Sequence, residues 1–182
     1  MPETKHNALS ARWRTPVMSV IRVVWGSGTG PTETAAYDAA LAGAGIHDYN
    51  LVTVSSVVPA DPPVEAVGTA PDLGPVGEEL TVVQARASVP PVESGTAHGG
   101  EPAVAAVGWA RSADGPGVFY EASGRDPERV RETVAAGLRH GCSLREWEPV
   151  DRELVVRTAD PAPDRHTCVV VCAVYGESRP LL

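Results

Sequence analysis

The chain is short of lysine and has no stretch of basic residues. Lys5 is its only lysine, and the net charge is -8. Proteins that bind nucleic acids gather Lys and Arg into a patch or stripe, so we expect no nucleic-acid partner. No run of about 18 apolar residues is present, and we therefore expect no transmembrane helix. Residues 1–17 also lack the apolar core of a secretory signal, which favours a cytoplasmic protein.

Cysteine is scarce as well, with Cys142, Cys168 and Cys172 as its three positions. A chain of 182 residues can bury a sufficient core without disulfides, so reduced thiols fit best. Cys168 and Cys172 lie in a β-branched run where alternation places both on one sheet face. We interpret them as buried core residues rather than metal ligands or a redox pair. The histidines show no ligand spacing, and no metal site is expected.

The hydrophobic pattern predicts one α+β domain with about seven strands and two helices. Thr32 and Gly45 are expected to cap the first helix, while Asp126, with Pro127 at the first helical position, and Gly141 bound the second. Two helices cover only part of the sheet area, which favours a β-sheet sandwich flanked by helices. An irregular, proline-rich loop is expected at 59–78. The strands are expected at 18–25, 49–58, 80–89, 103–111, 117–123, 152–158 and 167–175.

A glycine-rich segment, GSGTG at 26–30, separates the first strand from the first helix. Amides at a helix N-terminus attract anions, so the segment could bind phosphate. It lacks both the lysine of a P-loop and the spacing of a dinucleotide fingerprint. We therefore interpret it as a structural turn.

The most informative segment is GIHDYNLVTVSSVVP at 45–59. Its Ser55-Ser56 pair follows Asn50 by a few residues and is followed by Pro59. A Ser-Ser pair in a strand is ordinary by itself. The combination, preceded by a helix with Tyr37-Asp38, resembles the pyruvoyl-dependent arginine decarboxylases, whose proenzymes carry an asparagine-leucine strand, a Ser-Ser cleavage pair and then a proline.

The resemblance covers about residues 18 to 176. It is strongest over 26–59 and 115–148, and it is weak over 60–114, where this chain has a longer middle loop. Further motifs of the family match Ala44-Gly45-Ile46 before the asparagine, GVFYEASG with Glu121 in the place of the family's glutamate, the pair Arg131-Glu132 in a helix, and Trp147-Glu148 after it.

The resemblance implies a four-layer αββα fold and a protein that cleaves itself. Residues 1–17 would be an N-terminal extension, expected to be disordered. Residues 18–182 would form the decarboxylase domain, cut into fragments 1–55 and 56–182. The family is trimeric with active sites between subunits, so the resemblance also implies a homotrimer that acts on a small amino acid, with a covalent pyruvoyl group as its cofactor.

The implied chemistry converts L-arginine to agmatine and CO₂. Decarboxylation leaves a carbanion at Cα, and a carbonyl that forms a Schiff base with the substrate amine can absorb its electron pair. A serine can become that carbonyl. The Ser56 hydroxyl adds to the Ser55 carbonyl and forms an ester; β-elimination then frees the Ser55 carboxylate, and the remaining dehydroalanine hydrolyses to a pyruvoyl group and ammonia.

Three side chains take the remaining roles that the resemblance implies. Asn50 would donate to an oxyanion or orient the substrate. Glu121, in a largely apolar strand, would stay protonated and return a proton to Cα as general acid. Asp38 would accept a bidentate guanidinium.

Each side chain also has an ordinary interpretation, since Glu121 could be a surface residue near a strand end and Asp38 a solvent-facing helix residue. Two alternative functions therefore stay open. One is the same chemistry on another amino acid. The other is a non-catalytic trimeric relative that binds a ligand.

Overall fold

A computed structural model describes residues 20–93 and 100–182 of the chain, and the extension predicted at 1–17 lies outside the described residues. The described part contains two helices and nine strands, more strands than the sequence pattern predicts. In chain order they are β1 (Ile21–Gly30), α1 (Glu33–Ala44), β2 (Asn50–Thr53), β3 (Val57–Val58), β4 (Val64–Gly68), β5 (Glu79–Val89), β6 (Ala103–Ser112), β7 (Gly117–Gly124), α2 (Pro127–Ser143), β8 (Pro149–Ala159) and β9 (His166–Tyr175).

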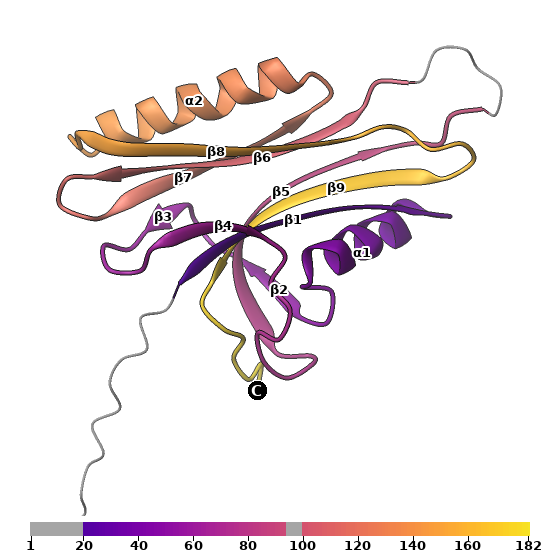
Figure 1. Ribbon diagram of the computed structural model, residues 1–182, viewed down its shortest axis with the longest axis horizontal. Coiled ribbons are helices and arrows are strands. Elements are labelled where there is room, and N and C mark those ends of the chain that lie inside the picture. The colour runs from indigo at the N-terminus through magenta and orange to yellow at the C-terminus, as the bar shows by residue number, and fades with distance from the viewer. Residues whose placement is uncertain (1–19, 94–99) are drawn as a thin grey trace, which may run out of the picture.

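The elements form four layers. A five-stranded sheet in the order β2-β5-β9-β1-β4 packs on a four-stranded sheet in the order β3-β7-β6-β8. Helix α1 covers the outer face of the first sheet, and α2 covers the outer face of the second (Figure 1). Each of the three interfaces between layers has its own apolar core. The predicted α+β sandwich flanked by helices is confirmed.

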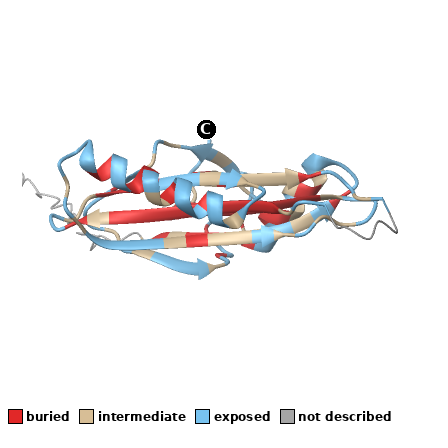
Figure 2. Ribbon diagram, turned by 90° about the horizontal axis from the view of Figure 1, so that it is seen from above, coloured by how far each residue is buried: buried red, intermediate tan, exposed pale blue. Residues whose placement is uncertain are grey.

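The core between the sheets contains the aromatic side chains of Trp109 and Phe119, with Tyr175 packed against them. The chain's only phenylalanine, Phe119, lies 6.3 Å from Trp109 and 6.0 Å from Tyr175 between ring centroids. Buried residues continue along the strands beneath α2 (Figure 2). Phe119 thereby fixes β7 in the middle of the molecule, next to the segment that carries the serine pair.

The cysteines belong to the cores beneath the helices. Cys168 and Cys172 lie on one face of β9 in the core under α1, and Cys142 lies in the core under α2. Burial raises the pKa of the Cys172 thiol to about 12, so this thiol stays protonated and unreactive. The interpretation of Cys168 and Cys172 as core residues is confirmed.

The glycine-rich segment is a strand, and the predicted turn is wrong. Strand β1 continues through Gly30 and pairs with β9 along its whole length. Gly26, Gly28 and Gly30 alternate on the side of α1, where an added Cβ would meet the backbone of that helix. These glycines therefore let helix and sheet approach closely, which a side chain would prevent.

The helix caps are as predicted, except for one end. The Thr32 hydroxyl accepts a hydrogen bond from the Ala35 N–H, and Gly45 ends α1 in the left-handed conformation with φ 78°. Asp126 caps α2, which begins at Pro127. However, α2 continues to Ser143, because Gly141 packs against β7 and remains helical.

The predicted strand at 49–58 is in fact two strands in different sheets. Strand β2 runs parallel to β5, whereas β3 is antiparallel to β7. The chain thus crosses from one sheet to the other between Thr53 and Val57. The predicted irregular loop at 59–78 is also corrected, since it contains β4, which pairs with β1 in parallel. No helix among the described residues is long and apolar enough to span a membrane.

Candidate active site

The serine pair lies at the crossing between the two sheets. The last backbone hydrogen bond on the first sheet runs from the Val54 N–H to the Val82 carbonyl, at 3.1 Å. The first on the second sheet runs from the Phe119 N–H to the Ser56 carbonyl, at 2.9 Å. Ser55 is exposed and Ser56 is half-buried. The bond between them therefore lies outside both hydrogen-bonded ladders, where the backbone can leave strand geometry.

The structure brings Ser56 and Glu121 together. The Ser56 hydroxyl donates a hydrogen bond to Oε2 of Glu121, with 2.8 Å between the oxygens. The antiparallel pairing of β3 with β7 produces this contact across 65 residues of sequence. A hydroxyl that donates to a carboxylate keeps its lone pairs available for attack, and the carboxylate can accept its proton.

Glu121 differs from the sequence-based expectation in its surroundings. The first half of β7 is buried, but Tyr120 and Glu121 are exposed in the single chain. The apolar strand therefore does not enclose the carboxyl group by itself. Any group that excludes water from Glu121 has to come from outside the described chain.

The carbonyl group that Ser56 would attack is hydrogen-bonded too. The Ser55 oxygen accepts the Val57 N–H at 2.9 Å. This N–H belongs to the same peptide unit as the Ser56 carbonyl, which Phe119 holds from the other side. A fixed donor at the Ser55 oxygen polarises the carbonyl and can stabilise the negative charge that attack would place there.

Tyr175 is a member of the site that the sequence does not reveal. Its hydroxyl donates to the Val57 carbonyl at 2.8 Å. Burial, and secondarily the charge of Glu121, raises the pKa of Tyr175 to about 12. The hydroxyl therefore keeps its proton at neutral pH and remains a donor. As the last residue of a hydrophobic strand, Tyr175 carries no sequence signal for this role.

Asn50 does not bond to the serine pair. It is exposed at the start of β2, and its Nδ2 donates to the Gly77 carbonyl at 2.6 Å. Its backbone N–H donates to the Glu78 carbonyl at 2.8 Å. Asn50 thus anchors β2 to the segment that precedes β5, and it stands at the opposite end of β2 from Ser55.

Asp38 is also separate from the pair. It is exposed on α1, on the outer side of the five-stranded sheet, and its carboxylate makes no hydrogen bond or ion pair with another described residue. Of the four predicted site residues, the single chain therefore unites two, Ser56 and Glu121.

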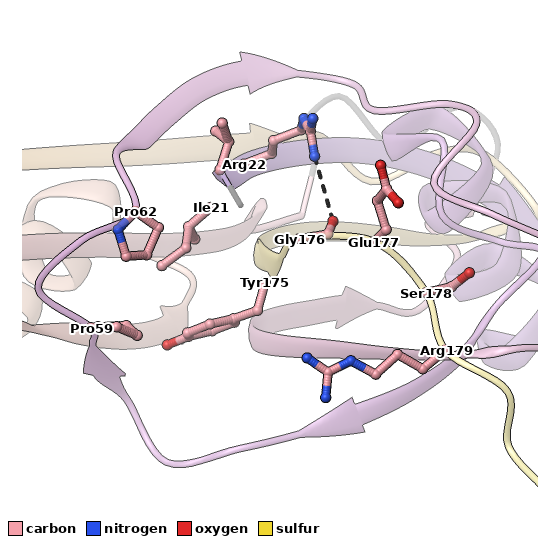
Figure 3. Close-up of a pocket in the computed structure, with 10 residues that line it drawn as sticks. Ile21, Arg22, Pro59, Pro62, Tyr175, Gly176, Glu177, Ser178 and Arg179 are labelled. Atoms are coloured by element: carbon pink, nitrogen blue, oxygen red, sulfur yellow. Dashed lines mark hydrogen bonds between the residues drawn. The ribbon is translucent and has the colours of Figure 1, made fainter. Parts of the chain in front are cut away.

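A pocket of about 530 Å³ adjoins Tyr175 (Figure 3). Its walls include Pro59 and Pro62, which follow the serine pair, together with Arg22 and Arg179. None of the predicted site residues lines it. The serine–glutamate pair therefore lies at the surface of the single chain and not inside this pocket.

A sequence profile of the family described as pyruvoyl-dependent arginine decarboxylase matches residues 20–180. The chain belongs to this family. The pyruvoyl-dependent arginine decarboxylase of Halobacterium salinarum is 46% identical to it over 165 residues, which cover 90% of this chain and 98% of the relative.

More distant relatives carry the same description. The protein of Methanothermobacter thermautotrophicus is 30% identical over 160 residues, covering 87% of this chain and 97% of the relative. That of Thermococcus kodakarensis is 32% identical over 151 residues, covering 80% and 89%. The resemblance stated from the sequence is confirmed. The chain is an enzyme of this family, with a covalently bound pyruvoyl group as cofactor and arginine as substrate.

Proposed function

We propose that the chain cleaves itself between Ser55 and Ser56, and that Ser56 becomes the pyruvoyl group with which the fragment 56–182 converts arginine to agmatine and CO₂. The 2.8 Å hydrogen bond from the Ser56 hydroxyl to Glu121 carries this proposal. This hydrogen bond joins our candidate nucleophile to our candidate base beside the Ser55–Ser56 peptide bond, in the stretch that crosses between the two sheets.

In the cleavage step, Glu121 accepts the hydroxyl proton while the Ser56 oxygen adds to the Ser55 carbonyl carbon. Negative charge develops on the Ser55 oxygen, where the Val57 N–H already donates. Loss of the Ser56 nitrogen from that carbon gives an ester and a free amine. Removal of the Cα proton of residue 56 then expels the Ser55 carboxylate, and hydrolysis of the remaining dehydroalanine releases ammonia and leaves the pyruvoyl group.

The residues around Ser56 fit a pyruvoyl group at this position. The Phe119 N–H binds the carbonyl of Ser56, and the Tyr175 hydroxyl binds that of Val57. Residue 56 therefore stays in place when it becomes a chain terminus. When bound in this way, the pyruvoyl carbonyl supplies an electron sink for the pair released with CO₂. We assign to Glu121 a second role at this stage, the delivery of a proton to the substrate Cα.

Substrate binding requires more than one copy of the chain. Electrostatic catalysis is strongest where water is excluded, yet Glu121 is exposed and Ser56 is only half-buried in the single chain. Asp38 is exposed and unpaired on the far side of the five-stranded sheet, so the Asp38 of a neighbouring copy is available to accept the guanidinium group in bidentate fashion. These observations support an assembly with its active sites between subunits, for which the family resemblance implies a homotrimer.

Asn50 retains donor capacity for substrate. One of its two amide hydrogens is used by Gly77. We assign the other to the substrate carboxylate or to an oxyanion, in the neighbouring subunit's site or in its own. The cytoplasm is the proposed compartment, since the three cysteines are all free and buried and a reducing environment keeps them so.

Intact mass spectrometry tests the proposal. Wild-type protein should yield fragments 1–55 and 56–182, the larger one without a free amino terminus. Ser56→Ala should remain one inactive chain. Ser123→Ala, which removes an exposed hydroxyl on β7 two residues from Glu121, should cleave normally. A wild-type chain that stays intact on prolonged incubation would contradict self-cleavage and favour the non-catalytic alternative.

Substrate choice is measured separately as CO₂ release from arginine, lysine, ornithine, histidine and aspartate. We expect turnover of arginine to exceed that of the others. Faster turnover of another amino acid would show that the enzyme carries out the same chemistry on that substrate instead of arginine.

A further inference from the structure

One arginine holds the backbone of the segment that follows the serine pair. Arg111 is half-buried near the end of β6. Its Nη1 donates to the carbonyls of Pro59 and Ala60, both at 3.1 Å, and to that of Gly115 at 2.7 Å. Its Nη2 donates to the carbonyl of Pro62. Four backbone carbonyls thus converge on one guanidinium group.

This use of a guanidinium group is unusual. Arginine ordinarily pairs with carboxylates or phosphates, whose geometry matches its fork of donors. In the described ranges no carboxylate forms an ion pair with Arg111. The four side-chain hydrogen bonds of Arg111 described above all go to carbonyl oxygens, and three of the four belong to the segment 59–62.

The sequence of that segment explains the need for such a donor. Pro59, Pro62 and Pro63 have no N–H, so the β3 ladder cannot continue past Val58. Carbonyl groups beyond a strand end still need hydrogen-bond partners. Arg111 supplies them from β6, which lies beyond β7 in the same sheet, and replaces the missing ladder.

The Pro63 carbonyl accepts the Ile21 N–H at 2.9 Å, and β4 begins at Val64, but residues 59–62 between β3 and this point have little other support. Strand β3 has only two residues, and the pocket of about 530 Å³ lies against Pro59 and Pro62 instead of a packed core (Figure 3). From Ser56 onward, the carbonyls of Ser56, Val57, Pro59, Ala60 and Pro62 are held by Phe119, Tyr175 and Arg111 in turn. Arg111 provides three of these five contacts.

We propose that Arg111 is a positioning residue for both self-cleavage and decarboxylation. This inference rests on the proposed function of Ser56. Before cleavage, the fixed segment keeps the Ser56 hydroxyl on Glu121. After cleavage, residue 56 is a chain terminus, and only the contacts downstream of it can hold the pyruvoyl group in place. Misplacement by about 1 Å can lower a rate by two orders of magnitude.

The variants Arg111→Lys and Arg111→Ala test this role. Lysine retains the charge but loses the planar fork that reaches several carbonyls. Arg145→Lys is the matched control, because Arg145 also donates to a carbonyl, that of Gly141, but at the end of α2. Self-cleavage is followed over time by intact mass spectrometry, and the unfolding temperature of each protein is measured in parallel.

We expect Arg111→Lys to remain folded and to cleave at least about tenfold more slowly than wild type. Its cleaved fraction should show a lower kcat with KM for arginine nearly unchanged, since the pyruvoyl position and not arginine binding is disturbed. Arg145→Lys should match wild type in cleavage rate. Arg111→Ala should cleave slowly and recover with millimolar ethylguanidinium, which can refill the vacated site.

Cleavage of Arg111→Lys at the wild-type rate would overturn the inference. The inference would also be overturned if Arg111→Ala cleaved slowly, had a lower unfolding temperature and did not recover with ethylguanidinium. That combination would indicate a purely structural role for Arg111. Failure of wild-type protein to cleave in the same experiment would instead contradict the proposed function of Ser56.

Discussion

Replacing Glu121 by glutamine separates proton transfer from hydrogen bonding at the serine pair. The glutamine amide oxygen can still accept the hydrogen bond that Ser56 now gives to Glu121 at 2.8 Å. It cannot take up the proton. General-base assistance contributes about 10²- to 10⁴-fold to a rate, or roughly 3–5 kcal/mol of activation free energy. We expect Glu121→Gln to slow self-cleavage within that range.

The assay is the appearance of fragments 1–55 and 56–182 after expression, measured by intact mass. Glu121→Asp keeps the base but withdraws it by one methylene group, so it should fall between wild type and Glu121→Gln. Glu132→Gln on α2 is the control, because that side chain is exposed and α2 lies on the outer face of the second sheet. In a Ser56→Ala background, where no protein is expected to cleave, all of these variants should unfold at nearly the same temperature, since Glu121 and Glu132 are exposed.

Cleavage of Glu121→Gln at the wild-type rate would refute the role of the carboxylate as base. If that variant cleaved normally but decarboxylated poorly, Glu121 would act only in the protonation of Cα, which is the role implied by the family resemblance alone. The structure adds the earlier role through the hydrogen bond to Ser56.

Two further predictions concern Asp38 and Tyr175. Asp38→Asn should raise KM for arginine by about tenfold or more, since a bidentate charged contact is lost, while self-cleavage continues at the wild-type rate; unchanged KM would remove Asp38 from the substrate site. Tyr175 has a pKa of about 12 in the folded chain and 10.0 as its ordinary value, so the stabilisation that it gives is present below pH 10 and is lost as the pH rises through 12. In a Ser56→Ala background, urea unfolding should give a larger free energy of unfolding with Tyr175 than with Tyr175→Phe, and this difference should shrink as the pH rises from 10 to 12. A difference that stays constant would argue against a buried, donating hydroxyl.

Local chemistry explains which parts of the fold were predictable. Thr32 and Asp126 are caps because their side-chain oxygens satisfy amides only a few residues away, which the sequence shows directly. The sequence pattern around Gly26 and Gly28 predicts a turn, because glycine adopts backbone conformations that other residues avoid. In the folded chain these glycines are needed because they have no side chain, which lets α1 pack closely on β1. That packing is a tertiary contact, which the local sequence does not show. The same holds for β4, which exists only because β1 pairs with it.

Some residues of the candidate site were also predictable from the sequence, and others were not. Ser56 and Glu121 were found through the family resemblance, and their contact depends on strand pairing between distant segments. Tyr175 and Arg111 were missed because both act on backbone carbonyls. A side chain that bonds to backbone far away in the sequence leaves no local motif and no complementary residue, so its role can be recognised only when the chain is folded.

The place of β1 in its sheet gives the cleaved enzyme an unusual kind of stability. Residues 1–55 contribute two strands to the five-stranded sheet: β1 lies between β9 and β4, and β2 lies at the edge beside β5. All three of these partner strands belong to the proposed fragment 56–182. Once the Ser55–Ser56 bond is broken, unfolding also separates two molecules, and the apparent stability of the protomer depends on its concentration. Under the proposed chemistry Ser56 is consumed by cleavage, so separated fragments that meet again could rebuild the sheet but could not generate the cofactor a second time.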